Sequence, residues 1–157
     1  MLELIHYYNP IMKPLQSITE CCACDVIKRL AESEEQAFRR FRNFDWYIEQ
    51  RRRTEKWLYD AFVQRGGKPN LTHPRYFVLG ESELLQHGYG ENSAMIRIPL
   101  DAVDTAHVSF TVDDSMKLFL EEKQPRIWLK EEIKAHRCCT NGAYVEAQIW
   151  DLRYFEC

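Results

Sequence analysis

Short stretches in the second half of the chain alternate apolar and polar residues in the pattern of half-buried β-strands. Residues 107–112 place valines and Phe110 on one side, and residues 144–150 place Val145, Ala147 and Ile149 on one side. Residues 126–129 fit either a short strand or the start of a helix. Three further stretches predict strands, at residues 2–8, 74–79 and 95–100, and Pro99 indicates that the last lies at an edge.

Helical spacing dominates the first half instead. Residues 45–64 predict a long helix whose apolar stripe includes Leu58 and Phe62, and Gly66-Gly67 follows, as is common after a helix end. Ser33 to Gln36 form a capping-box pattern that predicts another helix, carrying Phe38 and Phe41. Shorter helices are expected at about 12–18 and 131–137.

The order of these elements predicts the fold class. Helices come first and strands second, which favours an α+β fold in which a helical first half packs on a mostly antiparallel sheet. A length of 157 residues fits one domain, so we expect residues 1–157 to form a single domain.

Composition favours a soluble, cytoplasmic protein. No run of about 20 apolar residues is present, so we expect no membrane span. Residues 1–6 lack the features of a signal peptide, so reduced thiols are expected. The cysteine and histidine spacings are tighter than those of structural zinc sites, so we predict buried thiols and no metal. The cysteines are Cys21, Cys22, Cys24, Cys138, Cys139 and Cys157.

The charge is distributed unevenly. Residues 39–75 hold ten basic and four acidic residues, a balance of +6, although the whole chain carries −3. Such a segment favours a phosphate-bearing partner or cofactor, and the alternative is a solvated helix face. The bases that we expect to contact nucleic acid are Arg39, Arg40, Arg42, Arg53 and Lys56.

Three features could carry chemistry. Glu146 shares the polar side of its strand with aromatic residues, so it could act as a base or stabilise a cation; the alternative is a surface glutamate on an edge strand. The adjacent Arg51, Arg52 and Arg53 cover about 200° of a helix, so one should leave the exposed face, and arginine binds phosphates bidentately. His6 could bind a ligand or be a hydrogen-bonded core histidine.

Several common signatures are missing from the sequence. It contains no GxGxxG, GxxxxGK[ST], HExxH or GxSxG motif. The dinucleotide-binding Rossmann, kinase, zinc-protease and α/β-hydrolase classes therefore have no support.

Four short motifs in order resemble the DarT-type ADP-ribosyltransferases, which use NAD to modify nucleic-acid bases. The first is residues 5–8 followed by 13–18, and the second combines Gln50-Arg51-Arg52, Gly66-Gly67 and residues 74–77. The third is residues 109–115, and the fourth is residues 145–149. Tyr8 replaces the family's early threonine, and Gln148 takes the place of an apolar residue.

The resemblance implies a function and a site. It implies catalytic roles for Glu146 and Arg51, and NAD as the substrate that supplies ADP-ribose to a DNA or RNA base. The implied NAD-binding residues are His6, Tyr7, Arg52, Tyr76 and Phe77. A protein acceptor, an antitoxin-like partner and a role as a toxin or phage-defence factor stay open. The alternative function is a non-catalytic module that binds nucleic acid or a partner through residues 39–75.

Overall fold

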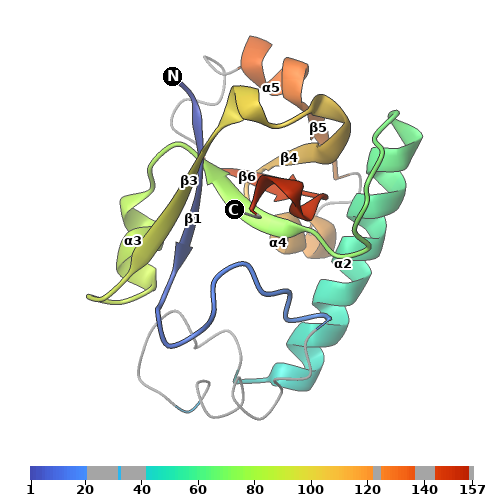
Figure 1. Ribbon diagram of the computed structural model, residues 1–157. Helices are drawn as coiled ribbons and strands as arrows, with labels where there is room; N and C mark the ends of the chain where they lie inside the picture. Colours follow the sequence, from blue (N-terminus) through green and yellow to red (C-terminus); the bar gives the residue numbers. More distant parts are fainter. Residues whose placement is uncertain (21–31, 33–41, 122–124, 137–143, 156–157) are drawn as a thin grey trace.

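A six-stranded antiparallel sheet forms the centre of the part of the chain that the structure describes, in the order β3-β1-β2-β6-β4-β5 (Figure 1). The structure is a computed structural model that describes residues 1–20, 32, 42–121, 125–136 and 144–155. The strands are β1 (Glu3–Tyr8), β2 (Arg75–Leu79), β3 (Ala94–Pro99), β4 (Val108–Val112), β5 (Trp128–Leu129) and β6 (Val145–Ile149). The α+β prediction is confirmed, and Pro99 does end an edge strand.

The helices lie around this sheet. They are α2 (Phe44–Gln64), α3 (Glu83–Gly88), α4 (Ser115–Glu121) and α5 (Lys130–Ala135), with 3₁₀ turns at Leu100–Ala102, Thr105–His107 and Leu152–Tyr154. The long predicted helix is confirmed as α2, and α5 corresponds to the helix expected at 131–137. The helix predicted to begin at Ser33 lies outside the described residues.

The helix predicted at 12–18 is wrong. This segment consists of turns and extended backbone, and Leu15 has a φ of +61°. Pro14 disfavours helical backbone in the residue before it. The Leu15 backbone is bound from outside: its N–H donates to His6 Nε2 and its carbonyl accepts from Arg75 Nε. These tertiary contacts hold a conformation that a helix could not provide.

Two glycines end α2 for different reasons. Gly66 has a φ of +93°, a conformation that glycine adopts without the steric penalty of a side chain. A Cβ built on Gly67 would lie 2.5 Å from the ring of Phe62, so this position requires a residue without a side chain. The chain can therefore turn back across the end of α2 toward β2.

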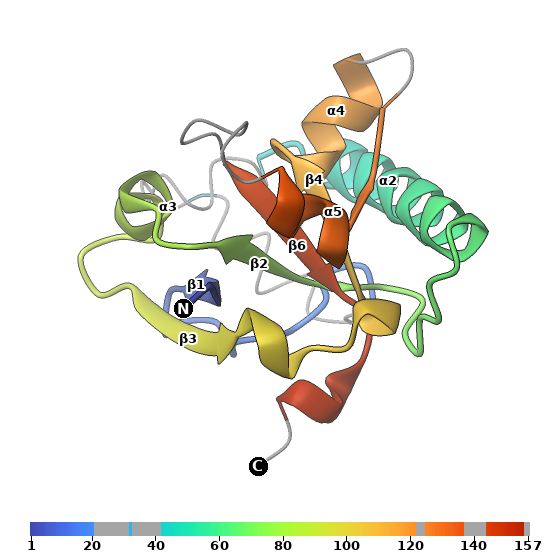
Figure 2. The same ribbon diagram turned by 90° about the horizontal axis from the view of Figure 1, so that it is seen from above.

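The two faces of the sheet are covered differently. The main apolar core lies on one face and includes Leu4, Phe77, Phe110, Ala147 and Ile149. Figure 2 shows the Leu152–Tyr154 turn on that side and α2 on the other. The helix α2 packs through its apolar side chains against residues that flank β5 and β6, in a second cluster that contains Leu58, Phe62, Ile127 and Trp150.

Strands β1 and β2 separate along their length. Among the described residues they pair at Leu4↔Leu79 and Ile5↔Val78, whereas β1 pairs with β3 along its whole length. Beyond Ile5, the ring of His6 bridges the two strands through a 2.8 Å hydrogen bond to the carbonyl of Tyr76. The separation opens the sheet at the end of β1 and the start of β2.

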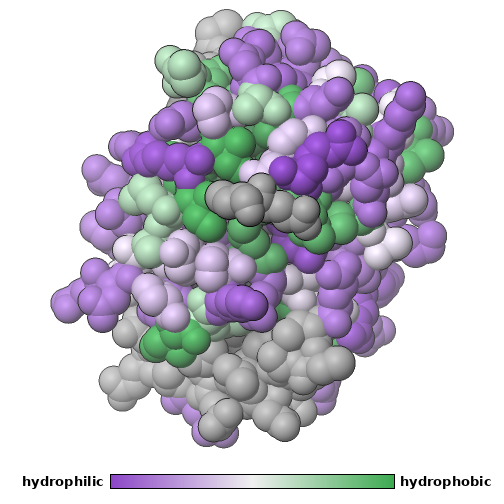
Figure 3. All heavy atoms as spheres, in the orientation of Figure 1, coloured by the Kyte–Doolittle hydropathy of each residue, from purple (hydrophilic) through white to green (hydrophobic). Residues whose placement is uncertain are grey.

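The surface is mostly hydrophilic on the face seen in Figure 3, where hydrophobic side chains form small separate patches. No helix in the described ranges has both the length and the apolar character needed to span a bilayer.

Candidate active site

A pocket of about 190 Å³ lies where β1 and β2 separate. Segment 15–18, helix α2, both separated strands, the Asp114 loop and β6 all contribute to its wall. Each water in the liquid takes about 30 Å³, so the pocket has room for several waters or for part of a small organic molecule. Its wall includes His6, Tyr7, Tyr47, Arg51, Glu55, Tyr76, Phe77, Asp114, Tyr144 and Glu146.

Glu146 lies in the interior of the protein, on a central strand. Strand β6 pairs with β2 through Val78↔Glu146 and with β4 through Thr111↔Glu146. The residue is only 3% exposed, so the alternative of a surface glutamate on an edge strand is wrong. Strand alternation sends Val145 and Ala147 into the apolar core and Glu146 to the opposite face, as the sequence predicted.

Burial raises the pKa of Glu146 to about 7, and the negative charge of Asp114 adds to this effect. The positive charge of Arg51 opposes the shift, as do hydrogen bonds that the carboxylate accepts. Ser115 donates through its hydroxyl at 2.5 Å and its backbone N–H at 3.3 Å, and Gln148 donates at 3.0 Å. A carboxyl group with this pKa can accept or release a proton near neutral pH.

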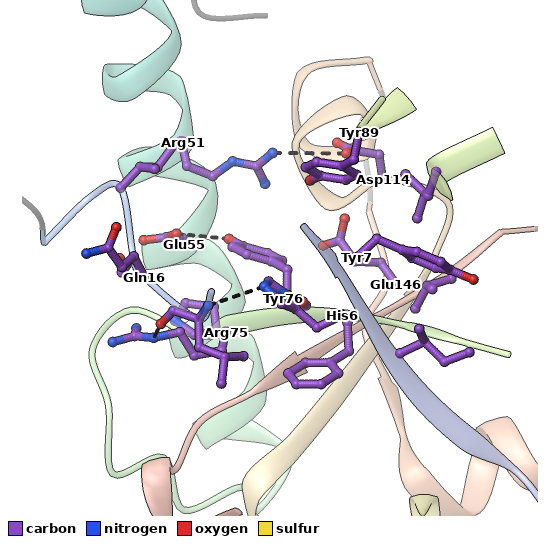
Figure 4. Close-up of a pocket in the computed structure, with 18 of the residues that line it drawn as sticks. His6, Tyr7, Gln16, Arg51, Glu55, Arg75, Tyr76, Tyr89, Asp114 and Glu146 are labelled. Carbon is purple, nitrogen blue, oxygen red and sulfur yellow. Dashed lines mark hydrogen bonds and ion pairs between the residues drawn. The ribbon is translucent and has the colours of Figure 1, made fainter. Parts of the chain in front are cut away.

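Arg51 enters the same pocket from α2. It extends toward Asp114, with an N–O distance of 4.0 Å (Figure 4). Its guanidinium donates to Tyr47 Oη at 3.1 Å and to Ser115 Oγ at 3.4 Å, and lies 5.0 Å from the ring centre of Tyr76. Burial lowers the pKa of Arg51. The surrounding Tyr47, Tyr76 and nearby carboxylates raise that pKa by more than burial lowers it, so the group stays cationic.

Glu55 is a pocket residue that the sequence did not single out. It is 2% exposed and accepts hydrogen bonds from Tyr76 Oη at 3.0 Å and Thr19 Oγ1 at 2.8 Å. His73 Nδ1 lies 2.6 Å from the same carboxylate. Glu55 lies one helical turn after Arg51, and this i,i+4 spacing was the available signal. The cluster joins segment 17–19 to α2 and fixes the Tyr76 ring beneath Arg51.

His6 lines the pocket, but both of its ring nitrogens have partners. Nδ1 donates to the Tyr76 carbonyl at 2.8 Å, and Nε2 accepts from the Leu15 N–H at 3.3 Å. These partners require a neutral ring protonated on Nδ1, and burial lowers the pKa of His6 accordingly. The structure therefore favours the core-histidine alternative, in which His6 holds the pocket wall together.

The other implied NAD-binding residues divide into two groups. Tyr7 and Tyr76 line the pocket, and Tyr7 Oη also accepts from the Ser82 N–H at 2.9 Å. Phe77 contributes to the wall but belongs to the apolar core, where it stacks on Phe155 at 5.5 Å between ring centres.

Arg52 does not reach the pocket. It is exposed, because successive residues of a helix point about 100° apart and Arg51 takes the inward direction. That Arg52 binds the cofactor stays a prediction, and the structure places this residue outside the pocket. Arg75 is the second arginine of the wall, and it binds the carbonyls of Leu15 and His73 and the carboxylate of Glu20.

The predicted nucleic-acid residues that the structure describes lie on the surface. Arg42, Arg53 and Lys56 are exposed, whereas Arg39 and Arg40 lie outside the described residues. Lys56 pairs with Asp60 at 2.9 Å, and the side chain of Gln50 accepts from Arg53 at 3.4 Å. The exposed face of α2 carries Asp45, Glu49 and Asp60 beside Arg52, Arg53 and Lys56, so the charges on this face balance.

The loop after β4 brings Asp114 and Ser115 to Glu146. Asp113 has a φ of +91°, and its side chain accepts from the Asp114 N–H at 2.7 Å. Such backbone is costly for a residue other than glycine, and it often occurs at functional sites. The motif at 109–115 was noted in the sequence, but its contact with β6 was not.

Within the described ranges, no group of three or more histidine, cysteine, aspartate or glutamate side chains could hold a metal ion. All six cysteines lie outside these ranges. Comparison with known proteins adds no assignment: no family model matches the sequence, and no curated protein or solved structure was found to be similar to it.

Proposed function

We propose that this protein is an NAD-dependent ADP-ribosyltransferase whose acceptor is a base of DNA or RNA. The observation that supports this most directly is Glu146, a buried carboxylate with a raised pKa on a central strand, beside a fixed arginine in a pocket lined with tyrosines. The resemblance of four motifs to DarT-type enzymes points to the same residue.

The pocket has the chemistry that such a reaction needs. The nicotinamide ring of NAD is aromatic and positively charged, and tyrosine faces and carboxylates attract such a ring. Glu55, Asp114 and Glu146 supply the carboxylates, and Tyr7, Tyr47, Tyr76, Tyr89 and Tyr144 supply the rings. Arg51 has five N–H donors, two of which bind Tyr47 and Ser115, so others can bind a phosphate oxygen.

The proposed step transfers one group. The bond between ribose C1′ and the nicotinamide nitrogen breaks, and its electron pair leaves with nicotinamide. The ribose then carries a positive charge, which the Glu146 carboxylate stabilises. A nitrogen or oxygen of the acceptor bonds to C1′, and its proton passes to Glu146.

The acceptor class is supported by the sequence more than by the pocket. Arg42, Arg52, Arg53 and Lys56 are exposed on and beside α2 and could contact a phosphate backbone. Their acidic neighbours predict a weak, salt-sensitive contact. If the test below finds ADP-ribose on a protein instead, the proposed acceptor changes and the proposed reaction stays.

The test is to incubate the purified protein with NAD and single-stranded DNA, RNA or a protein mixture, and to measure nicotinamide release and acceptor mass. We expect the mass of one ADP-ribosyl group on a nucleic acid, and a rate about a thousandfold lower for Glu146→Gln. Glu131→Gln, the same substitution at an exposed residue of α5 outside the pocket, is the matched control. No NAD consumption with any acceptor would refute the proposal and leave the non-catalytic binding module.

A further inference from the structure

A chain of buried hydrogen bonds runs behind Glu146. The indole Nε1 of Trp150 donates to Ser109 Oγ at 2.9 Å, and Ser109 Oγ donates to Gln148 Oε1 at 2.8 Å. The amide nitrogen of Gln148 then donates to Thr111 Oγ1 at 3.1 Å and to Glu146 Oε1 at 3.0 Å. Trp150, Ser109, Gln148 and Thr111 are all fully buried.

The direction of every bond in this chain is fixed. An indole N–H can only donate, so the single proton of Ser109 is free to point toward Gln148. The Gln148 oxygen must accept it, which turns the amide NH₂ toward Glu146. Thr111 donates its own proton to the Asp113 carbonyl at 3.0 Å, so its oxygen can accept the second amide proton. Reversing the amide would direct its oxygen at the carboxylate.

We infer that Gln148 is a positioning residue that holds Glu146 oriented and ionisable in the pocket, and that the chain from Trp150 sets its direction. This inference rests on the proposed function for the consequence to the reaction, but the contact to Glu146 is independent of it. Gln148 takes the place of an apolar residue in the motif that the sequence resembles, so this feature belongs to this chain.

The charged and titratable groups facing Glu146 determine what the amide adds. Asp114 disfavours the ionised carboxylate and Arg51 favours it, while the phenols of Tyr76 and Tyr144 lie nearby and have their own pKa values raised, mainly by burial. Ser115 and Gln148 supply the hydrogen bonds that favour ionisation. Removing the amide takes away one of the donors that favour the ionised carboxylate. The effect of Asp114, which disfavours ionisation, is then less fully offset.

The experiment compares Gln148→Leu and Gln148→Glu with the natural protein. The titration of Glu146 is followed by NMR of carboxyl-labelled glutamate and assigned with Glu146→Gln. We expect the midpoint to rise by about one pH unit in Gln148→Leu and by more in Gln148→Glu, where two carboxyl groups must share a proton. The rate of transfer should fall about tenfold at about pH 6 and recover at about pH 9.

Thr54→Val is the matched control, because Thr54 is fully buried and its hydroxyl donates to the Gln50 carbonyl, away from this chain. It should leave the midpoint and the pH profile unchanged. An unchanged midpoint in folded Gln148→Leu would overturn the inference. If that variant does not fold, Ser109→Ala replaces it: releasing the amide should raise the midpoint by a smaller amount, and an unchanged value would again refute the inference.

Failure of this inference and failure of the proposed function give different results. A shifted Glu146 midpoint in a protein that never consumes NAD keeps the role of Gln148 and removes the reaction. NAD consumption that depends on Glu146, with a midpoint unaffected by Gln148, keeps the reaction and removes the role.

Discussion

The two faces of β6 are buried to the same extent but for opposite purposes. Val145, Ala147 and Ile149 are at most 4% exposed and belong to the apolar core, whereas Glu146 and Gln148 are at most 3% exposed and make hydrogen bonds beneath the pocket. Burial therefore does not separate structural from functional residues in this strand. The chemical nature of the buried group does, because a buried carboxylate costs free energy that a buried isoleucine supplies.

Shortening an apolar-face residue should have the largest effect on stability. Ile149→Ala removes a fully buried side chain from the core, and we expect it to lower the free energy of unfolding by about 3–4 kcal/mol. Transfer by the folded fraction should be unchanged. Chemical denaturation measures the free energy of unfolding. The transfer rate is measured under conditions in which the protein is folded, and exposed Val63→Ala is the control. A strong loss of rate in folded protein would break the comparison.

The free-energy cost of burying Glu146 on the polar face should appear as a dependence of stability on pH. Because the folded pKa of Glu146 is raised from 4.5 to about 7, the folded state holds this proton more tightly than the unfolded state. The contribution of Glu146 to the free energy of unfolding is therefore largest below about pH 4.5. It falls by about 3 kcal/mol in total as the pH rises through about 7.

Denaturation of the natural protein and of Glu146→Gln at several pH values checks this. The difference between their free energies of unfolding should change by about 3 kcal/mol between about pH 4 and about pH 8, in favour of the variant at high pH. Parallel curves would mean that Glu146 has an ordinary pKa.

Two adjacent arginines sharpen the comparison on α2. Lysine at position 51 keeps the charge but cannot reproduce the planar contacts with Tyr47, Ser115 and the Tyr76 ring. We expect Arg51→Lys to reduce transfer about thirtyfold, or about 2 kcal/mol in activation free energy. The same substitution at exposed Arg52 should change the rate less than about twofold. Equal effects would contradict the assignment of Arg51 to the pocket.

The smallest effects are expected on the exposed face of α2. Arg53→Gln and Lys56→Gln should each reduce the salt dependence of nucleic-acid binding by about one charge. Nicotinamide release without an acceptor should stay the same. Binding measured across a salt series tests this, with exposed Lys68→Gln as the control. Salt slopes that do not change would exclude this face from the interface.

Local pattern predicted most of the fold. Helix α2 and the strands containing Phe110 and Glu146 followed from periodicity, because each is long enough for its buried face to repeat. The short helices α3 and α4 were not predicted, since six or seven residues carry too little periodicity. The segment around Leu15 was predicted wrongly because contacts from His6 and Arg75, distant in sequence, determine its backbone.

The site was predicted less completely than the fold. Glu146, Arg51 and Tyr76 were identified, because a carboxylate among rings and a run of arginines are visible in one dimension. The direction of each side chain was not predicted, so Arg52 was assigned to the cofactor site and Glu55 was overlooked. Asp114 and Ser115 meet Glu146 only because β4 and β6 are neighbours in the sheet. That pairing is a property of the topology.

The order of strands in the sheet has a consequence for synthesis. Strand β6 follows the other five along the chain, yet it occupies the space between β2 and β4. While a ribosome is still making this protein, β2 and β4 therefore each have an inner edge without its final neighbour. Glu146 arrives on the strand that fills this gap, so a nascent chain has no complete pocket until its sheet can close.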